Sequence, residues 1–137
     1  MPNQLIRLNF DKVMQTKTYT AVVLASDEKK FAIYTDPYIG KTLQLYLTKG
    51  EKPRPLTHDL LDYILKAVDI KVLQIVINDL QDTIYFARLY LEQQENDIKH
   101  IVEIDARPSD CITLALINNA PVYCTREVLD KTIPLDE

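Results

Sequence analysis

The sequence is poor in glycine, histidine and cysteine and has no tryptophan. Of its 137 residues, two are glycine, two are histidine and two are cysteine. Because glycine is the residue that most readily adopts a positive φ, this scarcity predicts short loops with few such positions. The sequence also lacks a Walker A loop, a dinucleotide-binding glycine motif, a nucleophile elbow and a His-Glu-x-x-His segment. P-loop NTPases, dinucleotide oxidoreductases, α/β-hydrolases and zincin proteases are therefore not first choices.

The cysteines and the lack of a long apolar run indicate in which compartment the protein is expected. Cys111 lies in a helix-like run and Cys124 ends a strand-like run, and the N-terminal sequence has no long apolar core. We predict two buried free thiols in a reducing compartment. The close ligand spacing of a zinc site with two cysteines and two histidines is absent. No run approaches the roughly 18 apolar residues of a membrane helix, so we expect a cytoplasmic soluble protein without a membrane span.

Length and net charge narrow the class of protein further. The length fits one domain over residues 1–137, and 47% hydrophobic with 26% charged residues is ordinary for a globular protein. The net charge is −4. This argues against a broad surface that coats nucleic acid, which would need surplus lysine and arginine. It leaves open an enzyme that acts on nucleic acid through a metal ion in an acidic pocket.

Hydrophobic patterning predicts an α+β domain, mostly antiparallel sheet with packed helices. Alternation and β-branched residues predict strands at 5–13, 18–26, 31–36, 71–79, 83–93, 100–106 and 120–124. Polar segments predict turns at 27–30, 79–82 and 94–99. Helical spacing and helix-start residues predict helices at 37–50, 57–69, 108–119 and 125–131.

Local residues suggest where these helices begin and end. Thr57 and Thr125 are expected N-caps, and Gly50 could close the helix that starts at Pro37. The second helix carries an apolar stripe at helical spacing, formed by Leu60, Leu61, Ile64, Leu65 and Val68. Each half of the chain also reads as three strands, a helix and an extended proline segment, followed by "THDLL" or "TREVL". Two duplicated β3-α-α units are one hypothesis.

Several groups could carry chemistry, and each also has a structural explanation. His58 lies in the first turn of a predicted helix, where it could bind an anion or simply belong to a polar first turn. His100 is expected to be a solvated residue at a strand start. Asp79 and Asp82 could shape a hairpin turn or hold Mg²⁺ or Mn²⁺.

The segment "DARPSD" concentrates charge at a strand-to-helix junction. Asp105 or Ser109 could cap the helix, and Asp110 suits the positive end of its dipole. Arg107 is opposed by that dipole and therefore needs a partner, such as Asp79, Asp105, Asp110 or a bound phosphate. Arg88, in an otherwise apolar strand, needs a partner too. A structural ion-pair network is an equally good explanation of both arginines.

Three segments resemble the bifunctional nuclease domain family: "RPLTHDLL" (54–61), "IVINDLQDTIYFARLYL" (75–91) and "IDARPSDCITLALINNAPVY" (104–123). The resemblance covers roughly residues 20 to 130. It implies an α+β domain of bacterial and plant proteins, some described as nucleases that act on DNA and RNA. The positions that match the family's motifs are Arg54, Thr57, His58, Asp59, Asp79, Arg88, Asp105, Arg107, Ser109 and Asp110.

The chain departs from this family's pattern after the third predicted strand. Where the family usually has Gly, Glu and Ala, this sequence has Asp36, Ile39 and Gly40. If that Glu is a metal ligand or a base, the site here is impaired unless Asp36 replaces it. Cys111 where the family prefers Ala is a milder change.

The resemblance implies a nuclease that binds nucleic acid transiently. Asp79, Asp105 and Asp110 would hold Mg²⁺ or Mn²⁺, and His58 would be the general acid or base. Phosphate would be bound by Arg54, Arg88, Arg107 and Ser109, and the catalytic set would be His58, Asp79, Arg107 and Asp110. The alternative is a non-catalytic binding or regulatory module on the same fold, often oligomeric.

Assembly is a separate expectation. Consecutive apolar residues at 22–24 and 85–87 suggest strands that are covered on both faces. The sequence's eight tyrosines suit an interface. A homo-oligomer, most simply a two-fold dimer, could provide the cover. The alternative is that the N-terminal strand and the C-terminal segment cover the second face within one chain.

Overall fold

The structure is a computed structural model that describes residues 4–135. It is a mixed α+β fold with one seven-stranded sheet in the order β3-β2-β1-β7-β4-β5-β6. The elements are β1 (Leu5–Gln15), β2 (Thr20–Ala25), β3 (Lys30–Thr35), α1 (Pro37–Thr48), α2 (Thr57–Ala67), β4 (Ile70–Gln81), β5 (Ile84–Glu95), β6 (Ile98–Ala106), α3 (Pro108–Asn118), β7 (Val122–Thr125) and α4 (Arg126–Lys131).

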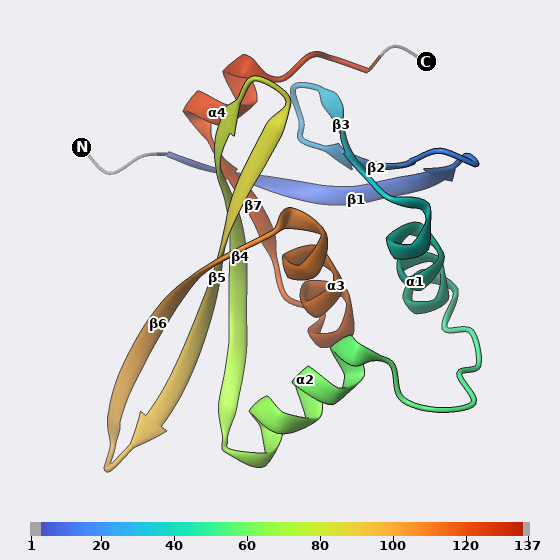
Figure 1. Ribbon diagram of the computed structural model, residues 1–137. Helices are drawn as coiled ribbons and strands as arrows, with labels where there is room; N and C mark the ends of the chain where they lie inside the picture. Colours follow the sequence, from blue (N-terminus) through green and yellow to red (C-terminus); the bar gives the residue numbers. More distant parts are fainter. Residues whose placement is uncertain (1–3, 136–137) are drawn as a thin grey trace.

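The sheet is mostly antiparallel, as predicted, and only the pairing of β4 with β7 is parallel. Helices α1, α2 and α3 gather on one side of the twisted sheet, whereas α4 lies apart beside β7 (Figure 1). Each half contributes a three-stranded meander, but β7 has no counterpart in residues 49–56, which form no strand. The duplication stays a hypothesis. No helix within residues 4–135 is long and apolar enough to cross a membrane.

The turns differ from expectation because aspartate and asparagine take the place of glycine. In the described part of the chain six residues have a positive φ, all are non-glycine, and five are Asp or Asn: Lys49, Asp69, Asp82, Asn96, Asp97 and Asn119. Short polar side chains tolerate this region. The scarcity of glycine therefore does not limit tight turns. Strand β4 also continues through Asp79 to Gln81, so the turn predicted at 79–82 is shorter and lies at residues 82–83. The turn at 94–99 is likewise shorter, because β5 ends at Glu95 and β6 begins at Ile98.

Three predicted helix ends were wrong. Lys49 at φ 53°, not Gly50, is the C-cap of α1. Leu56, not Thr57, is the N-cap of α2, and the Asp59 carboxylate accepts a hydrogen bond from the Leu56 N–H at 2.8 Å. Arg107 precedes α3, so neither Asp105 nor Ser109 caps it. The prediction for Thr125 is confirmed, because its hydroxyl accepts a hydrogen bond from Val128 N–H at 3.1 Å.

The core fills the space between the sheet and its helices. Cys111 and Cys124 are buried free thiols, as predicted. Burial raises the pKa of Cys111 to about 12 and that of Cys124 to about 11, so both stay protonated thiols.

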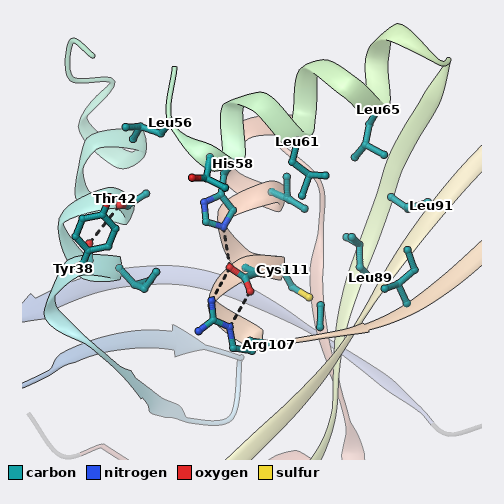
Figure 2. A pocket seen from close by; sticks show the side chains of 16 residues that line it. Tyr38, Thr42, Leu56, His58, Leu61, Leu65, Leu89, Leu91, Arg107 and Cys111 are labelled. Atoms are coloured by element: carbon teal, nitrogen blue, oxygen red, sulfur yellow. Dashed lines mark hydrogen bonds and ion pairs between the residues drawn. The ribbon is translucent and has the colours of Figure 1, made fainter. Parts of the chain in front are cut away.

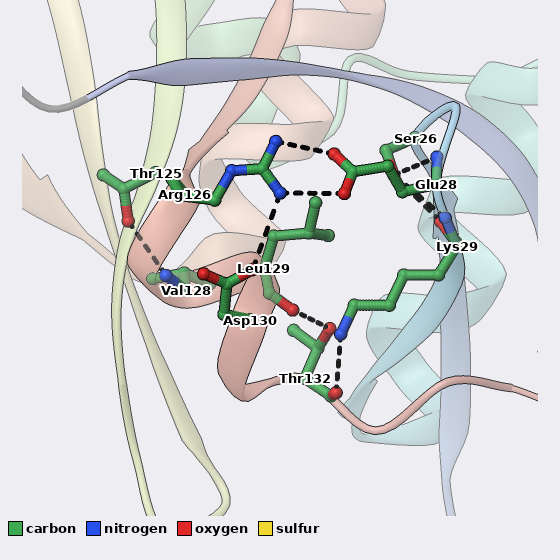
Figure 3. Close-up of polar contacts among 9 residues, drawn as sticks. All are labelled: Ser26, Glu28, Lys29, Thr125, Arg126, Val128, Leu129, Asp130 and Thr132. Atoms are coloured by element: carbon green, nitrogen blue, oxygen red, sulfur yellow. Dashed lines mark hydrogen bonds and ion pairs between the residues drawn. The ribbon is translucent and has the colours of Figure 1, made fainter.

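Polar contacts, shown in Figure 3, join the C-terminal segment to the turn between β2 and β3. Arg126 donates two hydrogen bonds to Glu28, at 2.8 and 2.6 Å, and Lys29 Nζ donates to the Thr132 carbonyl at 2.9 Å. Residues 21–24 of β2 are at most 1% exposed in this single chain. A second copy is therefore not needed to cover residues 21–24, as in the alternative of cover within one chain, and the homo-oligomer stays a prediction.

Candidate functional site

A cavity of about 630 Å³ lies between the helices and strands β5 and β6 (Figure 2). The first turns of three helices line it: α1 through Tyr38 and Ile39, α2 through His58, and α3 through Asp110. Its walls are mostly apolar, from Leu56, Leu61, Leu65, Leu89, Leu91, Ile104, Ala106, Cys111 and Leu114. The polar side chains His58, Arg107 and Asp110 lie where α2 and α3 begin, here termed the polar end of the cavity.

At that end three predicted residues converge. His58 Nε2 lies 2.9 Å from Asp110 Oδ1. Arg107 donates from Nε to Asp110 Oδ2 at 2.9 Å and from Nη2 to Oδ1 at 3.3 Å. The Asp110 carboxylate therefore lies between the imidazole and the guanidinium, and dashed lines in Figure 2 mark the bonds that the labelled His58 and Arg107 make. The expectation that Arg107 needs a partner is thus met by Asp110.

Asp110 and Arg107 shift each other's pKa so that both stay charged. Burial alone would raise the pKa of Asp110, but hydrogen bonds from Arg107 and His58 hold it below its ordinary value. The bond to Asp110, with a smaller contribution from the charge of Asp36, raises the pKa of Arg107. Asp110 is therefore a carboxylate at neutral pH, and it orients His58 with Nε2–H as donor. Nδ1 then has no hydrogen-bond partner among residues 4–135.

The approach to α2 fixes the position of His58. Lys52 Nζ lies 3.0 Å from Asp59 Oδ1 and 4.3 Å from the centre of the Tyr46 ring on α1. Asp59 also accepts from Leu56 N–H, so the loop and the first turn of α2 are held together. Farther along α2, Asp62 accepts a hydrogen bond from Asn118 of α3 at 3.0 Å. These contacts fix the start of α2 against α1 and α3.

Two other predicted residues lie on the opposite face of the sheet. Leu89 and Ile104 line the cavity, and strand side chains alternate between faces. Arg88 and Asp105, which are paired across β5 and β6, therefore point away from it. Arg88 Nε lies 3.7 Å from Glu103 Oε1, a structural ion pair of the kind considered above.

Thr57, another residue of the family's motifs, lines the cavity, whereas Asp79, Ser109 and Arg54 lie outside its lining. Asp79 stands at a register irregularity in β4, and its carboxylate accepts from Leu80 N–H and Gln81 Nε2. Ser109, in the first turn of α3, is buried, with 7% of its surface exposed. Arg54 is exposed on the loop before α2, and His100 is exposed on β6.

The carboxylates predicted as metal ligands do not converge. Among the described residues 4–135, Asp110 is the one carboxylate that lines the cavity. Within residues 4–135 no group of three His, Cys, Asp or Glu side chains is arranged to hold a metal ion. The predicted trio Asp79, Asp105 and Asp110 thus does not by itself form a ligand set.

Sequence reasoning missed the apolar walls of the cavity. Leu61 and Leu65 were recognised as part of a stripe on α2, but this face is partly open, with Leu61 41% exposed. Ile39 was seen only as a departure from a motif, yet it lines the cavity. Alternation of Leu89 and Leu91 in β5 was the signal that could have placed both on one face.

Comparison with known proteins agrees with the resemblance. Two uncharacterized proteins of Mycobacterium tuberculosis, MT1877 of strain CDC 1551 / Oshkosh and Rv1829 of strain ATCC 25618 / H37Rv, are each 34% identical over 79 residues. The match covers 58% of this chain and 44% of each relative, so it spans less than half of their length. The model of the bifunctional nuclease domain matches residues 22–134. The chain belongs to the bifunctional nuclease domain family, which indicates a nuclease-like function.

Proposed function

We propose that this domain hydrolyses phosphodiester bonds of DNA and RNA at the cavity end that holds His58, Asp110 and Arg107. The observation that carries the proposal is the hydrogen-bonded set of these three side chains at the start of α2 and α3. It occurs in a chain of a nuclease family. A base, a cation and an oriented carboxylate beside a cavity can support hydrolysis of a phosphate diester.

His58 is the proposed general acid or base. Asp110 accepts a hydrogen bond from Nε2–H, which leaves Nδ1 to take a proton from water or, once protonated, to give it to the leaving oxygen. Water oxygen forms the new bond to phosphorus, and the bond to the leaving oxygen breaks. The His58 side chain is 13% exposed, so it is shielded but reachable from the cavity.

Arg107 is the proposed phosphate ligand. Two of its nitrogens donate to Asp110, but a guanidinium has five N–H donors and this side chain is 68% exposed. The first turns of α1, α2 and α3 surround the same space, and helix N-termini favour anions. A phosphate at this end would meet positive potential although the whole chain is acidic.

The proposal includes Mg²⁺ or Mn²⁺ as a cofactor, and removal of the metal tests this part separately. Mg²⁺ commonly uses one or two protein carboxylates and completes its shell with water and substrate phosphates. Asp110 is the carboxylate in the cavity that could serve. A metal requirement predicts that EDTA stops cleavage and that added Mg²⁺ or Mn²⁺ restores it. Cleavage at an unchanged rate in EDTA would remove the metal from the proposal.

The experiment is cleavage of labelled single-stranded DNA and RNA by highly purified protein. The double variant His58→Ala, Arg107→Ala should lose the activity, whereas Arg7→Ala, His100→Ala should keep it. The control removes the same residue types, Arg7 from β1 and His100 from β6, away from the cavity. Equal cleavage by both double variants would assign the activity to another site or to a contaminant.

A second candidate is a non-catalytic binding or regulatory module. Ile39 favours it, because this apolar side chain lines the cavity where the family pattern has a glutamate. The mostly apolar walls point the same way. This function predicts that phosphate or a nucleotide raises the melting temperature without being consumed. Turnover that is lost with His58 and Arg107 would exclude it.

A further inference from the structure

Tyr38 presents an open aromatic ring at the cavity. It lies in the first turn of α1 and lines the cavity, yet it is 73% exposed. Within residues 4–135 its ring has no aromatic partner and its hydroxyl makes no hydrogen bond. Figure 2 shows the labelled Tyr38 on the α1 side of the cavity, with His58 and Arg107 at the starts of α2 and α3. The ring therefore borders the same space as the proposed phosphate ligand.

The backbone that carries this ring is fixed at the start of α1. The Asp36 side chain accepts a hydrogen bond from Ile39 N–H at 2.9 Å and so caps the helix. The Thr42 hydroxyl donates to the Tyr38 carbonyl at 3.3 Å. Tyrosine has only two χ angles, so ordering its ring on a ligand costs little conformational entropy. Tyr38 is therefore suited to act as a stacking surface.

The rest of the cavity determines what can lie on this ring. Its volume of about 630 Å³ is that of a small-molecule site, and its walls beyond the polar end are mostly apolar. Arg107 has N–H donors beyond the two that bind Asp110, so it can also bind an anion. A ligand that uses all of these features has an anionic group at one end and a flat aromatic group at the other.

We propose that the cavity binds one nucleotide at both of its ends, with the phosphate on Arg107 and the nucleobase stacked on Tyr38. The proposal rests on the proposed function of Arg107 as phosphate ligand and adds the residue that holds the neighbouring base. Stacking on an aromatic side chain contributes strongly to the binding of unpaired nucleotides. A base inside a duplex is covered on both faces, so it has to leave its own stack to reach Tyr38.

The lining offers few groups that could select one base over another. Arginine, lysine, asparagine, glutamine and the acidic residues are the usual readers of base edges. Of these types, the cavity lining in the described chain contains only Arg107 and Asp110, which bind each other at the polar end. Every base has an aromatic face. Affinity should therefore depend on the presence of a base and only weakly on its identity.

The segment from α1 to the start of α2 is positively charged, although the chain has a net charge of −4. Residues 37–56 contain one acidic residue, Glu51, and four cations: Lys41, Lys49, Lys52 and Arg54. Lys52 pairs with Asp59, whereas the other three cations are exposed. Exposed cations attract the phosphates of a nucleic acid strand. This local charge favours the approach of a strand on the side of the cavity where Tyr38 lies.

Isothermal titration calorimetry of the full chain with 5′-AMP and ribose 5-phosphate tests the stacking, because only AMP has a base. Wild-type protein should bind AMP at least about fivefold more tightly. Tyr38→Leu should remove this difference, since it keeps an apolar side chain without the ring, whereas Tyr38→Phe should retain it. Arg107→Ala should weaken both ligands alike. Tyr34→Leu is the matched control, because Tyr34 is 62% exposed on β3 and outside the cavity lining.

Equal affinity of wild-type protein for the two ligands, or a preference for AMP that persists in Tyr38→Leu, would overturn the proposal. Hexyl phosphate separates stacking from apolar contact, and tighter binding of hexyl phosphate than of AMP would also overturn it. None of these ligands contains a phosphodiester, so their binding does not depend on cleavage. Binding that requires both the base and Tyr38, without turnover of nucleic acid, would reject the proposed hydrolysis and support the stacking site. Turnover together with equal binding of AMP and ribose 5-phosphate would reject the stacking site alone.

Discussion

His58 Nε2 and Asp110 Oδ1 lie 2.9 Å apart although 52 positions separate them in the sequence. Their bond joins the first turn of α2 to the first turn of α3 at one end of the cavity. Arg107 completes the arrangement from the other side of the same carboxylate. Asp110 therefore links two groups that the proposed hydrolysis uses, and its removal should affect both stability and chemistry.

The first prediction concerns Asp110 and pH. Its hydrogen bonds hold its pKa below the ordinary value, so it stabilises the fold above the unfolded pKa of about 3.9. That contribution is lost as pH falls through the folded pKa. Asp110→Asn should therefore cost about 1–2 kcal/mol at pH 7. Below about pH 3 the difference from wild type should shrink. Chemical denaturation at both pH values measures this.

Asp130→Asn is the control for that series, because Asp130 is 64% exposed and pairs with Arg126 at 3.5 Å. Exposed pairs contribute little, so this variant should change stability by less than about 1 kcal/mol at either pH. An equal loss for Asp110→Asn at pH 7 and pH 2.5 would show that its charge is not what stabilises the fold.

The second prediction concerns the contact of α1 with β2. A Cβ added at Gly40 would lie 2.0 Å from Thr20 Oγ1, and Thr20 is fully buried. Alanine normally favours a helix, but here the clash should dominate. Gly40→Ala should cost about 1–3 kcal/mol. Thermal unfolding measures this loss.

Two variants check the cause of that loss. Gly50→Ala would meet only the flexible end of Leu45, so it should cost less than Gly40→Ala. Thr20→Ala should recover part of the stability of Gly40→Ala, since it removes the closest atom, an oxygen with no hydrogen-bond partner in the described chain. Additive losses from the two substitutions would rule out this contact as the cause.

The third prediction concerns Asp59. It is 5% exposed and joins Leu56 and Lys52 to the start of α2. Asp59→Ala should cost about 1–2 kcal/mol, because it leaves the Leu56 N–H without its acceptor. Glu127→Ala is the matched control, an acidic residue in the first turn of α4 whose side chain is 72% exposed. If the two variants unfold at the same denaturant concentration, the Asp59 contacts do not stabilise the helix start.

The general fold could be predicted because hydrophobic periodicity and turn residues determine it locally. The wrongly predicted ends of strands also have a local cause. Asp79 is a favoured turn residue, yet here it sits at a strand irregularity that residue preference cannot show. The hydrogen bonds of Arg126 with Glu28, 98 positions apart, tie α4 to the turn after β2. Such distant pairings are not visible in a local pattern.

The candidate site was predictable in part. His58, Arg107 and Asp110 were placed near helix starts by sequence, and the packing of α2 on α3 brings these starts together. Arg88 and Asp105 matched a family motif, but strand alternation turns them to the other face. A motif therefore identified the neighbourhood, whereas the fold determined which members meet.

The most direct measurement is kcat/KM for cleavage of single-stranded RNA by wild-type protein, His58→Ala and His100→Ala under identical conditions. General acid–base catalysis by His58 predicts a loss of about 10²–10⁴ in His58→Ala. His100, exposed on β6 and outside the cavity, should be replaceable with less than about a threefold change. A His58→Ala variant that is folded and as active as wild type would contradict the account.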